Sequence, residues 1–276
     1  MNGIATQPEP AKKPAEFVEA LAKGLSILEA FGAANSEMTL SEVAREVGLS
    51  PAAARRSLIT LTALGYVGQV GKRFHLTPKV MSLGSSFYFS ARIDELLQPE
   101  LRSLVELHGD ASSVATLDGE DVIYIAHYSV QRARRATAVV GARYPALATS
   151  LGRVLVAGLP DDELDRFFEM ARPRALTNKT CIDKEELKRA VYRVRELAYA
   201  TTVDQLDYGI TALAVPIRGP DGVTVAALNS SGYTGMVTPD QLVAERLQDL
   251  RAASSRITQT LARYPMLASV MRSSGF

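Results

Sequence analysis

At 276 residues, of which 47% are hydrophobic and 22% charged, the chain is long enough for two ordinary cores and has a globular composition. It has no run of about 18 apolar residues that could span a membrane, and residues 1–15 lack the apolar segment of a signal peptide, so we expect a flexible N-terminus and no membrane contact. The single cysteine, Cys181, excludes an intrachain disulfide, and the scattered histidines lack metal-ligand spacing, so we expect a cytoplasmic protein without metal or cofactor.

The positive charge is concentrated in one segment. Residues 45–92 contain seven basic residues and one acidic residue, a net charge of +6, whereas residues 93–276 contain 21 basic and 23 acidic residues. A basic patch in one short segment is typical of phosphate contact, although a solvated protein surface can carry the same charge. The predicted elements of this segment therefore decide the interpretation.

The first predicted element is a helix over residues 16–31, because apolar residues recur there with the spacing of one helical face. Its buried face is expected to consist of Val18, Leu21, Leu25 and Leu28. Thr39 or Ser41 is predicted to cap a second helix, and Thr39 can form a capping box with Glu42.

A short turn containing Gly48 joins the second helix to a third, which runs from Pro51 to Leu64 with Ser50 as its N-cap. Two short helices joined by such a turn are typical of the helix-turn-helix motif, whose second helix enters the major groove of DNA. Alanine allows close approach to the bases, and arginine can bind guanine through two hydrogen bonds. The residues predicted to contact DNA are Ser50, Ala52, Ala53, Arg55 and Arg56. The periodicity alone is equally compatible with a plain helical hairpin.

A β-hairpin is predicted directly after the third helix. Residues 65–70 and 74–76 have the composition of two short strands, joined across Gly71, Lys72 and Arg73. A basic hairpin in this position is typical of the wing of a winged helix, and Lys72 and Arg73 would lie against the phosphate backbone. We therefore predict a winged helix-turn-helix DNA-binding domain over residues 16–78.

A linker helix over residues 79–92 is predicted to lead into a larger domain over residues 93–276. The helices of this domain are expected at residues 94–108, 150–159, 161–171, 183–198 and from 238 onward, with Ser150 and Asp183 as N-caps. Its strands are expected at residues 112–117, 121–128, 137–140, 210–216 and 224–230. This order predicts an α+β domain with a mixed or antiparallel sheet.

One candidate ligand site precedes the predicted helix that starts at residue 150. Arg143, Tyr144, Thr149 and Ser150 converge there, and the N-terminus of a helix presents unpaired N–H groups that hold carboxylates. An arginine adds a two-pronged bond, and Gly152 would let the backbone approach the ligand. The local sequence by itself favours a simpler alternative, in which Ser150 is an ordinary cap and Arg143 faces solvent.

The sequence lacks the common catalytic motifs. It has no Gly-x-Ser-x-Gly nucleophile elbow and no Walker or Rossmann glycine pattern. We interpret His127 as a half-buried structural residue rather than a base, and Cys181 as an incidental thiol. We therefore predict no catalytic residue and no enzyme. The rival hypothesis is a metabolite-binding protein or an enzyme whose winged helix mediates protein contact.

The chain resembles the IclR family of bacterial transcriptional regulators over nearly its whole length. The segments that carry the resemblance are residues 20–28, 48–56, 61–67, 149–155, 207–210 and 214–217, together with Pro145. Arg55, Arg56 and residues 206–209 are most similar to the branch that controls aromatic-acid breakdown, such as the protocatechuate, 4-hydroxybenzoate and β-ketoadipate pathways. The chain departs from the family at Gln205, where an acidic residue is expected.

The resemblance implies a GAF-like effector-binding domain and assembly as a homodimer or a dimer of dimers. It also implies that a small organic acid, aromatic or keto, controls binding to palindromic double-stranded DNA or contact with RNA polymerase. The effector-contacting positions that it adds are Thr202, Ile210, Ala212, Asn229 and Ser231, of which the last two face the same side of a strand. Tyr208 would cover an aromatic ligand, although core packing explains this residue equally well.

Overall fold

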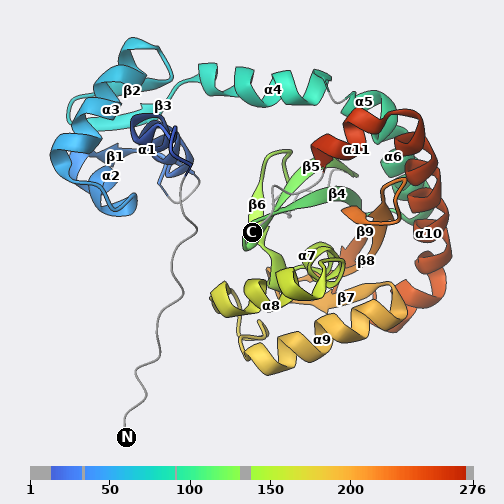
Figure 1. Ribbon diagram of the computed structural model, residues 1–276. Helices are drawn as coiled ribbons and strands as arrows, with labels where there is room; N and C mark the ends of the chain where they lie inside the picture. The colour runs from blue at the N-terminus through green and yellow to red at the C-terminus, as the bar shows by residue number, and fades with distance from the viewer. Residues whose placement is uncertain (1–13, 33–34, 91, 131–137, 272–276) are drawn as a thin grey trace, which may run out of the picture. The chain divides into compact units, whose positions relative to one another are not determined.

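A computed structural model of the protein describes residues 14–32, 35–90, 92–130 and 138–271 (Figure 1). The chain forms two compact units, Met1–Ser86 and Phe87–Phe276, and the boundary between them falls within a helix. Of the N-terminal segment expected to be flexible, residues 1–13 lie outside the described residues. No helix within the described ranges combines the length and apolar character that crossing a membrane requires.

The N-terminal unit packs helices against a small antiparallel sheet of strand order β1-β3-β2. Its elements are α1 Glu19–Glu29, β1 Met38–Thr39, α2 Leu40–Glu46, α3 Pro51–Ala63, β2 Val67–Val70 and β3 Arg73–Leu76. The β2–β3 hairpin confirms the predicted wing, and the pairing of Val70 with Arg73 leaves Gly71 and Lys72 at its tip. The short strand β1 has no local sequence signal, because it exists only by pairing with β3.

The helix starts of this unit follow the predicted capping chemistry. Thr39 donates its backbone N–H to the Glu42 carboxylate at 2.8 Å and accepts the N–H of Glu42 on its hydroxyl at 3.4 Å, which confirms the capping box. Ser50 accepts the N–H of Ala53 at 3.3 Å at the start of α3. Both helices therefore begin where the sequence predicts.

The buried face of α1 is only partly the one predicted from the sequence. Leu28 packs against the core as predicted, but Ile27 is the fully buried residue, and Val18, Leu21 and Leu25 are exposed. The helix reaches the core of its unit only through its C-terminal half, where Ile27 packs with residues of α2 and α3 such as Val43 and Leu58. An apolar stripe shows which face of a helix is hydrophobic, but it does not show where the rest of the unit lies.

The C-terminal unit begins within the helix α4 Met81–Ser90, which follows a 3₁₀ turn, Pro78–Val80. Its helices are α5 Ile93–Leu96, α6 Gln98–His108, α7 Ser150–Ala157, α8 Asp161–Met170, α9 Lys184–Leu197, α10 Pro239–Arg263 and α11 Pro265–Met271. Its strands are β4 Ala111–Asp118, β5 Asp121–Ser129, β6 Arg143–Pro145, β7 Ala200–Val203, β8 Ile210–Arg218 and β9 Thr224–Tyr233. All the strand pairs are antiparallel, in the order β6-β5-β4-β9-β8-β7, so the fold is α+β as predicted.

Helices cover both faces of this sheet (Figure 1). On one face, α6, α10 and α11 bury alternate strand residues such as Val114, Leu213 and Leu228. On the other face, α7, α8 and α9 pack on the intervening residues, among them Ala115 and Ala227. The alternation along the strands, interrupted in β5 by an irregularity opposite Val114 and Ala115, determines which side chains face α7. It therefore determines the lining of the site described below.

Three expectations for this unit need correction. The helix predicted over residues 94–108 is broken at Leu97, because Pro99 has no N–H to donate to the carbonyl of residue 95. The third strand is Arg143–Pro145 rather than 137–140; residue 137 lies outside the described residues, and residues 138–140 form no strand. This edge strand is selected by its pairing with β5.

The third correction concerns the start of α7, which is capped by Thr149 rather than by Ser150. The hydroxyl of Thr149 accepts the N–H of Gly152 at 2.9 Å. The cap predicted for α9 is confirmed, since Asp183 accepts the N–H of Glu186 at 2.7 Å.

Candidate functional site

The helix α3 and the wing present basic side chains on the N-terminal unit. Because Ala54, Leu58 and Leu61 are buried, Arg55 and Arg56 lie on the exposed side of α3. Ser50 and Ala52 are also exposed, whereas Ala53, which we expected to be exposed, is half-buried. The first turn of α3 carries no acidic residue, so no neighbouring carboxylate on this turn offsets its positive end.

Arg55 and Lys72 line one groove of about 790 Å³ between α3 and the wing, together with Ser41 and Gln69. The two predicted DNA-contacting elements therefore contribute cations to a common surface. Arg73 differs from Lys72, because its guanidinium donates to the Glu37 carbonyl at 3.3 Å and lies 3.8 Å from the Glu42 carboxylate. Lys72 is thus the better placed of the two for phosphate contact.

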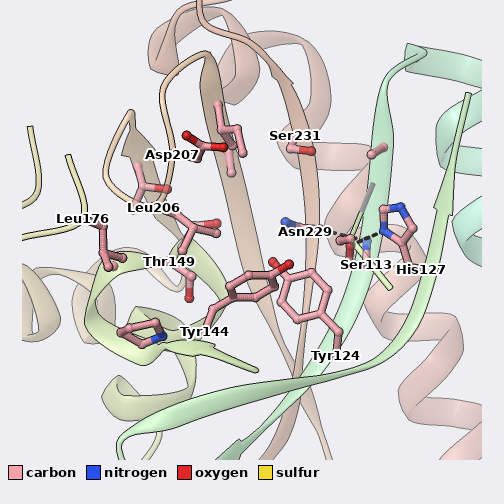
Figure 2. Close-up of a pocket in the computed structure, with 18 of the residues that line it drawn as sticks. Ser113, Tyr124, His127, Tyr144, Thr149, Leu176, Leu206, Asp207, Asn229 and Ser231 are labelled. Carbon is pink, nitrogen blue, oxygen red and sulfur yellow. Dashed lines mark hydrogen bonds between the residues drawn. The ribbon is translucent and has the colours of Figure 1, made fainter. Parts of the chain in front are cut away.

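The C-terminal unit contains a cavity of about 400 Å³ between the sheet and the start of α7 (Figure 2). Strand register places its sheet residues in two rows that run across the strands on one face. One row contains Asn229, Ser113 and His127; the second contains Thr202, Ala212, Ser231, Ala111 and Ser129. Most of these side chains are small, which leaves space where larger residues would fill the core.

The start of α7 forms the opposite wall of the cavity. Ser150 lines it and is only 1% exposed, and its hydroxyl has no hydrogen-bond partner among the described residues. A buried hydroxyl without a partner is unusual, because an unmade hydrogen bond costs about 1–3 kcal/mol. The position of Ser150 beside the N–H groups of a helix N-terminus suits an acceptor such as a carboxylate.

Two tyrosines lie between these walls. The rings of Tyr124 and Tyr144 meet edge to face with centroids 5.1 Å apart, and Figure 2 shows both hydroxyls directed into the pocket. Burial raises the pKa of both phenols, and the charge of Asp207 adds to the effect on the pKa of Tyr144. Both tyrosines therefore stay neutral at physiological pH and offer flat, polarisable surfaces to a planar ligand.

The two arginines of the pocket differ in their partners. Arg143 is paired with the carboxylates of Asp118 and Asp121, which offset its charge. Arg174 is exposed at the mouth of the pocket and has no carboxylate partner within the described part of the chain. An anionic ligand can therefore bind the Arg174 guanidinium without displacing a carboxylate of the protein, as it would have to do at Arg143.

Both units match known families. Residues 20–71 match the IclR helix-turn-helix domain, and residues 88–259 match the bacterial transcriptional regulator IclR C-terminal domain. The chain belongs to the IclR family. The resemblance identified in the sequence is thus confirmed, and this IclR-family protein is a transcriptional regulator with a DNA-binding helix-turn-helix.

The relatives of this IclR-family regulator include proteins with aromatic substrates or ligands in their names. Over 247 residues it is 34% identical to the Pca regulon regulatory protein of Pseudomonas putida, covering 89% of this chain and 85% of that protein. It is 32% identical over 247 residues to the p-hydroxybenzoate hydroxylase transcriptional activator of Acinetobacter baylyi, covering 88% and 91%. The chain is also similar to a solved structure of the PobR inducer-binding domain from Acinetobacter, a double mutant in complex with 3-hydroxybenzoic acid. The two share 28% sequence identity with a TM-score of 0.55, and the match covers 58% of this chain and 94% of that one.

The structure brings most of the predicted effector residues of this IclR-family regulator together. The predicted residues that line the pocket are Arg143, Tyr144, Thr149, Ser150, Thr202, Ile210, Ala212, Asn229 and Ser231. Tyr208 is not among the lining residues: its side chain is 57% exposed and its hydroxyl accepts the N–H of Asn178 at 3.0 Å, so neither a ligand cover nor core packing describes it. Gly152 packs against the preceding turn instead, since a Cβ there would lie 2.1 Å from the Ala146 carbonyl oxygen.

Sequence reasoning missed several lining residues that come from other parts of the chain. They include Asp110, Ser113, Tyr124, Ser129, Arg174, Leu176, Leu206 and Asp207, and also His127, which we interpreted as structural only. The strand residues can be recognised as pocket residues only once the register of β4 with β5 and β9 is known. Arg174 lies on a loop, where no periodic pattern marks it.

Gln205, the departure from the family pattern, has a structural role. Its side-chain oxygen accepts from Arg153 at 3.1 Å and from the N–H of Cys181 at 2.9 Å, and its amide donates to the Lys179 carbonyl at 2.7 Å. Gln205 does not line the pocket, but the next residues, Leu206 and Asp207, do. The amide therefore holds the loop that positions them.

Proposed function

We propose that this regulator binds a palindromic operator as a homodimer or a dimer of dimers, and that a small aromatic acid in the pocket controls it. Occupancy changes either DNA binding or contact with RNA polymerase. The protein acts in the cytoplasm and catalyses no reaction. The observation that carries the effector assignment is the buried hydroxyl of Ser150, which has no partner in the described part of the chain and lies in a pocket that also presents two tyrosine rings. The names of the relatives, which refer to hydroxybenzoates, support the same ligand class.

In this proposal the acid lies with its carboxylate toward α7. Ser150 and the N–H groups at the start of α7 bind the carboxylate, and Arg174 supplies positive charge at the mouth. The ring packs between Tyr144 and the apolar side chains of Leu206 and Ile210. A mobility shift with genomic fragments, with and without aromatic acids, tests the whole proposal. If the protein shifts no fragment with or without the acids, it is not a DNA-binding regulator.

For DNA recognition, we expect Arg56→Ala to weaken operator binding by about 1–3 kcal/mol and to relax the preference for one base pair, because a bidentate bond to guanine is removed. Fluorescence anisotropy with base-substituted operator fragments measures both effects. The control Lys72→Ala removes a proposed phosphate contact, so it should weaken binding to all fragments equally. Unchanged affinity and unchanged preference in Arg56→Ala would remove Arg56 from the recognition surface.

For the pocket, we expect Ser150→Ala to have opposite effects on stability and on ligand affinity. The free protein gains about 1 kcal/mol of unfolding free energy or stays unchanged, because a buried hydroxyl without a partner is removed. Benzoate affinity falls, because the same hydroxyl binds the carboxylate. Denaturant unfolding and isothermal titration calorimetry measure the two quantities.

The control is Ser254→Ala, which removes a buried hydroxyl that donates to the Pro216 carbonyl at 2.6 Å on the opposite face of the sheet. This variant should lose stability and keep its benzoate affinity. An unchanged affinity in Ser150→Ala, with the control behaving as expected, would show that the hydroxyl does not contact the acid.

A further inference from the structure

A hydrogen-bonded chain of side chains crosses the sheet wall of the pocket, opposite α7 (Figure 2). The Asn229 side-chain oxygen accepts the backbone N–H of Ser113 at 2.8 Å. The Ser113 hydroxyl lies 2.9 Å from His127 Nδ1, and His127 Nε2 lies 3.3 Å from the Ser129 hydroxyl. All four residues line the cavity.

The orientation of the Asn229 amide follows from its partner. A backbone N–H can only donate, so the side-chain oxygen of Asn229 must face Ser113 and the NH₂ group must point the other way. Asn229 is only 5% exposed, and its NH₂ group has no hydrogen-bond acceptor among the described residues. The NH₂ group faces the cavity (Figure 2). The pocket therefore presents a donor that an acceptor atom of a ligand can reach.

His127 makes the rest of the chain adaptable. Burial lowers the pKa of its imidazole, so the ring is neutral at physiological pH, with one donor nitrogen and one acceptor nitrogen. One serine accepts the hydrogen bond from the imidazole N–H, so its own O–H can donate to a ligand. The other serine donates its O–H to the second ring nitrogen, so its oxygen lone pairs can accept from a ligand. A change of tautomer exchanges the two roles of Ser113 and Ser129.

We propose that Asn229, Ser113 and Ser129, arranged around His127, form the binding site for a hydroxyl group on the ring of the effector. This inference rests on the proposed aromatic acid. The phenol oxygen accepts a hydrogen bond from the Asn229 NH₂ group, and the phenol O–H donates to a serine oxygen. A hydroxyl group therefore matches both the donor and the acceptor of the network. The site selects hydroxylated aromatic acids over the unsubstituted acid.

A second carboxylate fits this end of the pocket poorly. His127 is neutral, and the cationic residues that line the pocket, Arg143 and Arg174, come from other segments than β4, β5 and β9. Figure 2 shows Thr149 and Leu176 on one side of the cavity, and Asn229, Ser113 and His127 on the other. The two ends therefore differ in chemistry, with anion binding at α7 and, at the sheet, hydrogen-bonding groups beside the buried carboxylate of Asp110 instead of a cation.

The test compares benzoate with 3-hydroxybenzoate and 4-hydroxybenzoate by isothermal titration calorimetry on the full-length protein. In the wild type, at least one hydroxybenzoate should bind about tenfold more tightly than benzoate. In Ser113→Ala this ratio should fall to near one, while the Kd for benzoate changes less than about twofold. Ser129→Ala, a less buried change on β5, should lower the ratio in the same direction and decides the question if Ser113→Ala does not fold.

The matched control is Ser112→Ala, the same substitution at the neighbouring buried residue, whose hydroxyl donates to the Asn229 carbonyl and does not line the pocket. It should keep the wild-type ratio. An unchanged ratio in both pocket variants, or no preference for either hydroxybenzoate in the wild type, overturns this inference alone. If no benzoate binds the wild type at all, the proposed effector class fails together with it.

Discussion

Operator affinity of the full-length protein is expected to fall by roughly a thousandfold or more when monovalent salt rises from about 50 mM to about 200 mM. Each chain presents exposed cations on α2, α3 and the wing, namely Arg45, Arg55, Arg56 and Lys72. Two chains on a palindromic site would together make roughly six to ten phosphate contacts, and each contact releases counterions from the DNA. The salt dependence is therefore a direct measure of phosphate contact.

The measurement is the slope of log affinity against log salt concentration, obtained by fluorescence anisotropy on a promoter fragment. Lys72→Ala should make the slope shallower by about one for each phosphate that Lys72 no longer neutralises. Arg73→Ala is the matched comparison and should change it less, because Arg73 already lies 3.8 Å from the Glu42 carboxylate. A flat dependence in the wild type would exclude phosphate contact as the main source of affinity.

The largest expected effect on stability comes from Gly152→Ala, which should destabilise the C-terminal unit by about 3 kcal/mol or more. A Cβ at this position would lie 2.1 Å from the Ala146 oxygen and 2.4 Å from its Cα, and these are backbone atoms that cannot rotate away. The clash would separate α7 from the turn Ala146–Ala148 that precedes it. The Thr149 cap and the position of Ser150 would be disrupted with it, so binding of aromatic acids should also weaken.

Thermal unfolding followed by circular dichroism, with and without benzoate, measures both consequences. Gly24→Ala in α1 is the control, because a Cβ there meets nothing within 4 Å and alanine is the better helix former. The control should leave stability unchanged or raise it by up to about 1 kcal/mol. A Gly152→Ala protein with wild-type unfolding would show that α7 can shift without cost.

Local chemistry explains why the sequence by itself was sufficient for α2, α3 and the hairpin of the winged helix. The capping box of Thr39 and Glu42 joins residues three apart, as does the Ser50 cap, and the hairpin closes over Gly71 and Lys72. Interactions over such short separations depend on neighbouring residues alone. The basic segment, the order of the elements and the α+β class follow from the same kind of signal.

The tertiary structure alone decided which side chains meet. Ser113, His127 and Asn229 become neighbours only through the register of β4 with β5 and β9, and a shift of one residue would turn each of them to the opposite face. The pairing of Arg143 on β6 with Asp118 on β4, and the absence of any such partner for Arg174 within the described ranges, likewise depend on segments that the fold brings together. Whether a hydrophobic or charged side chain is covered or free depends on what packs beside it, and residues distant in the chain supply that neighbour.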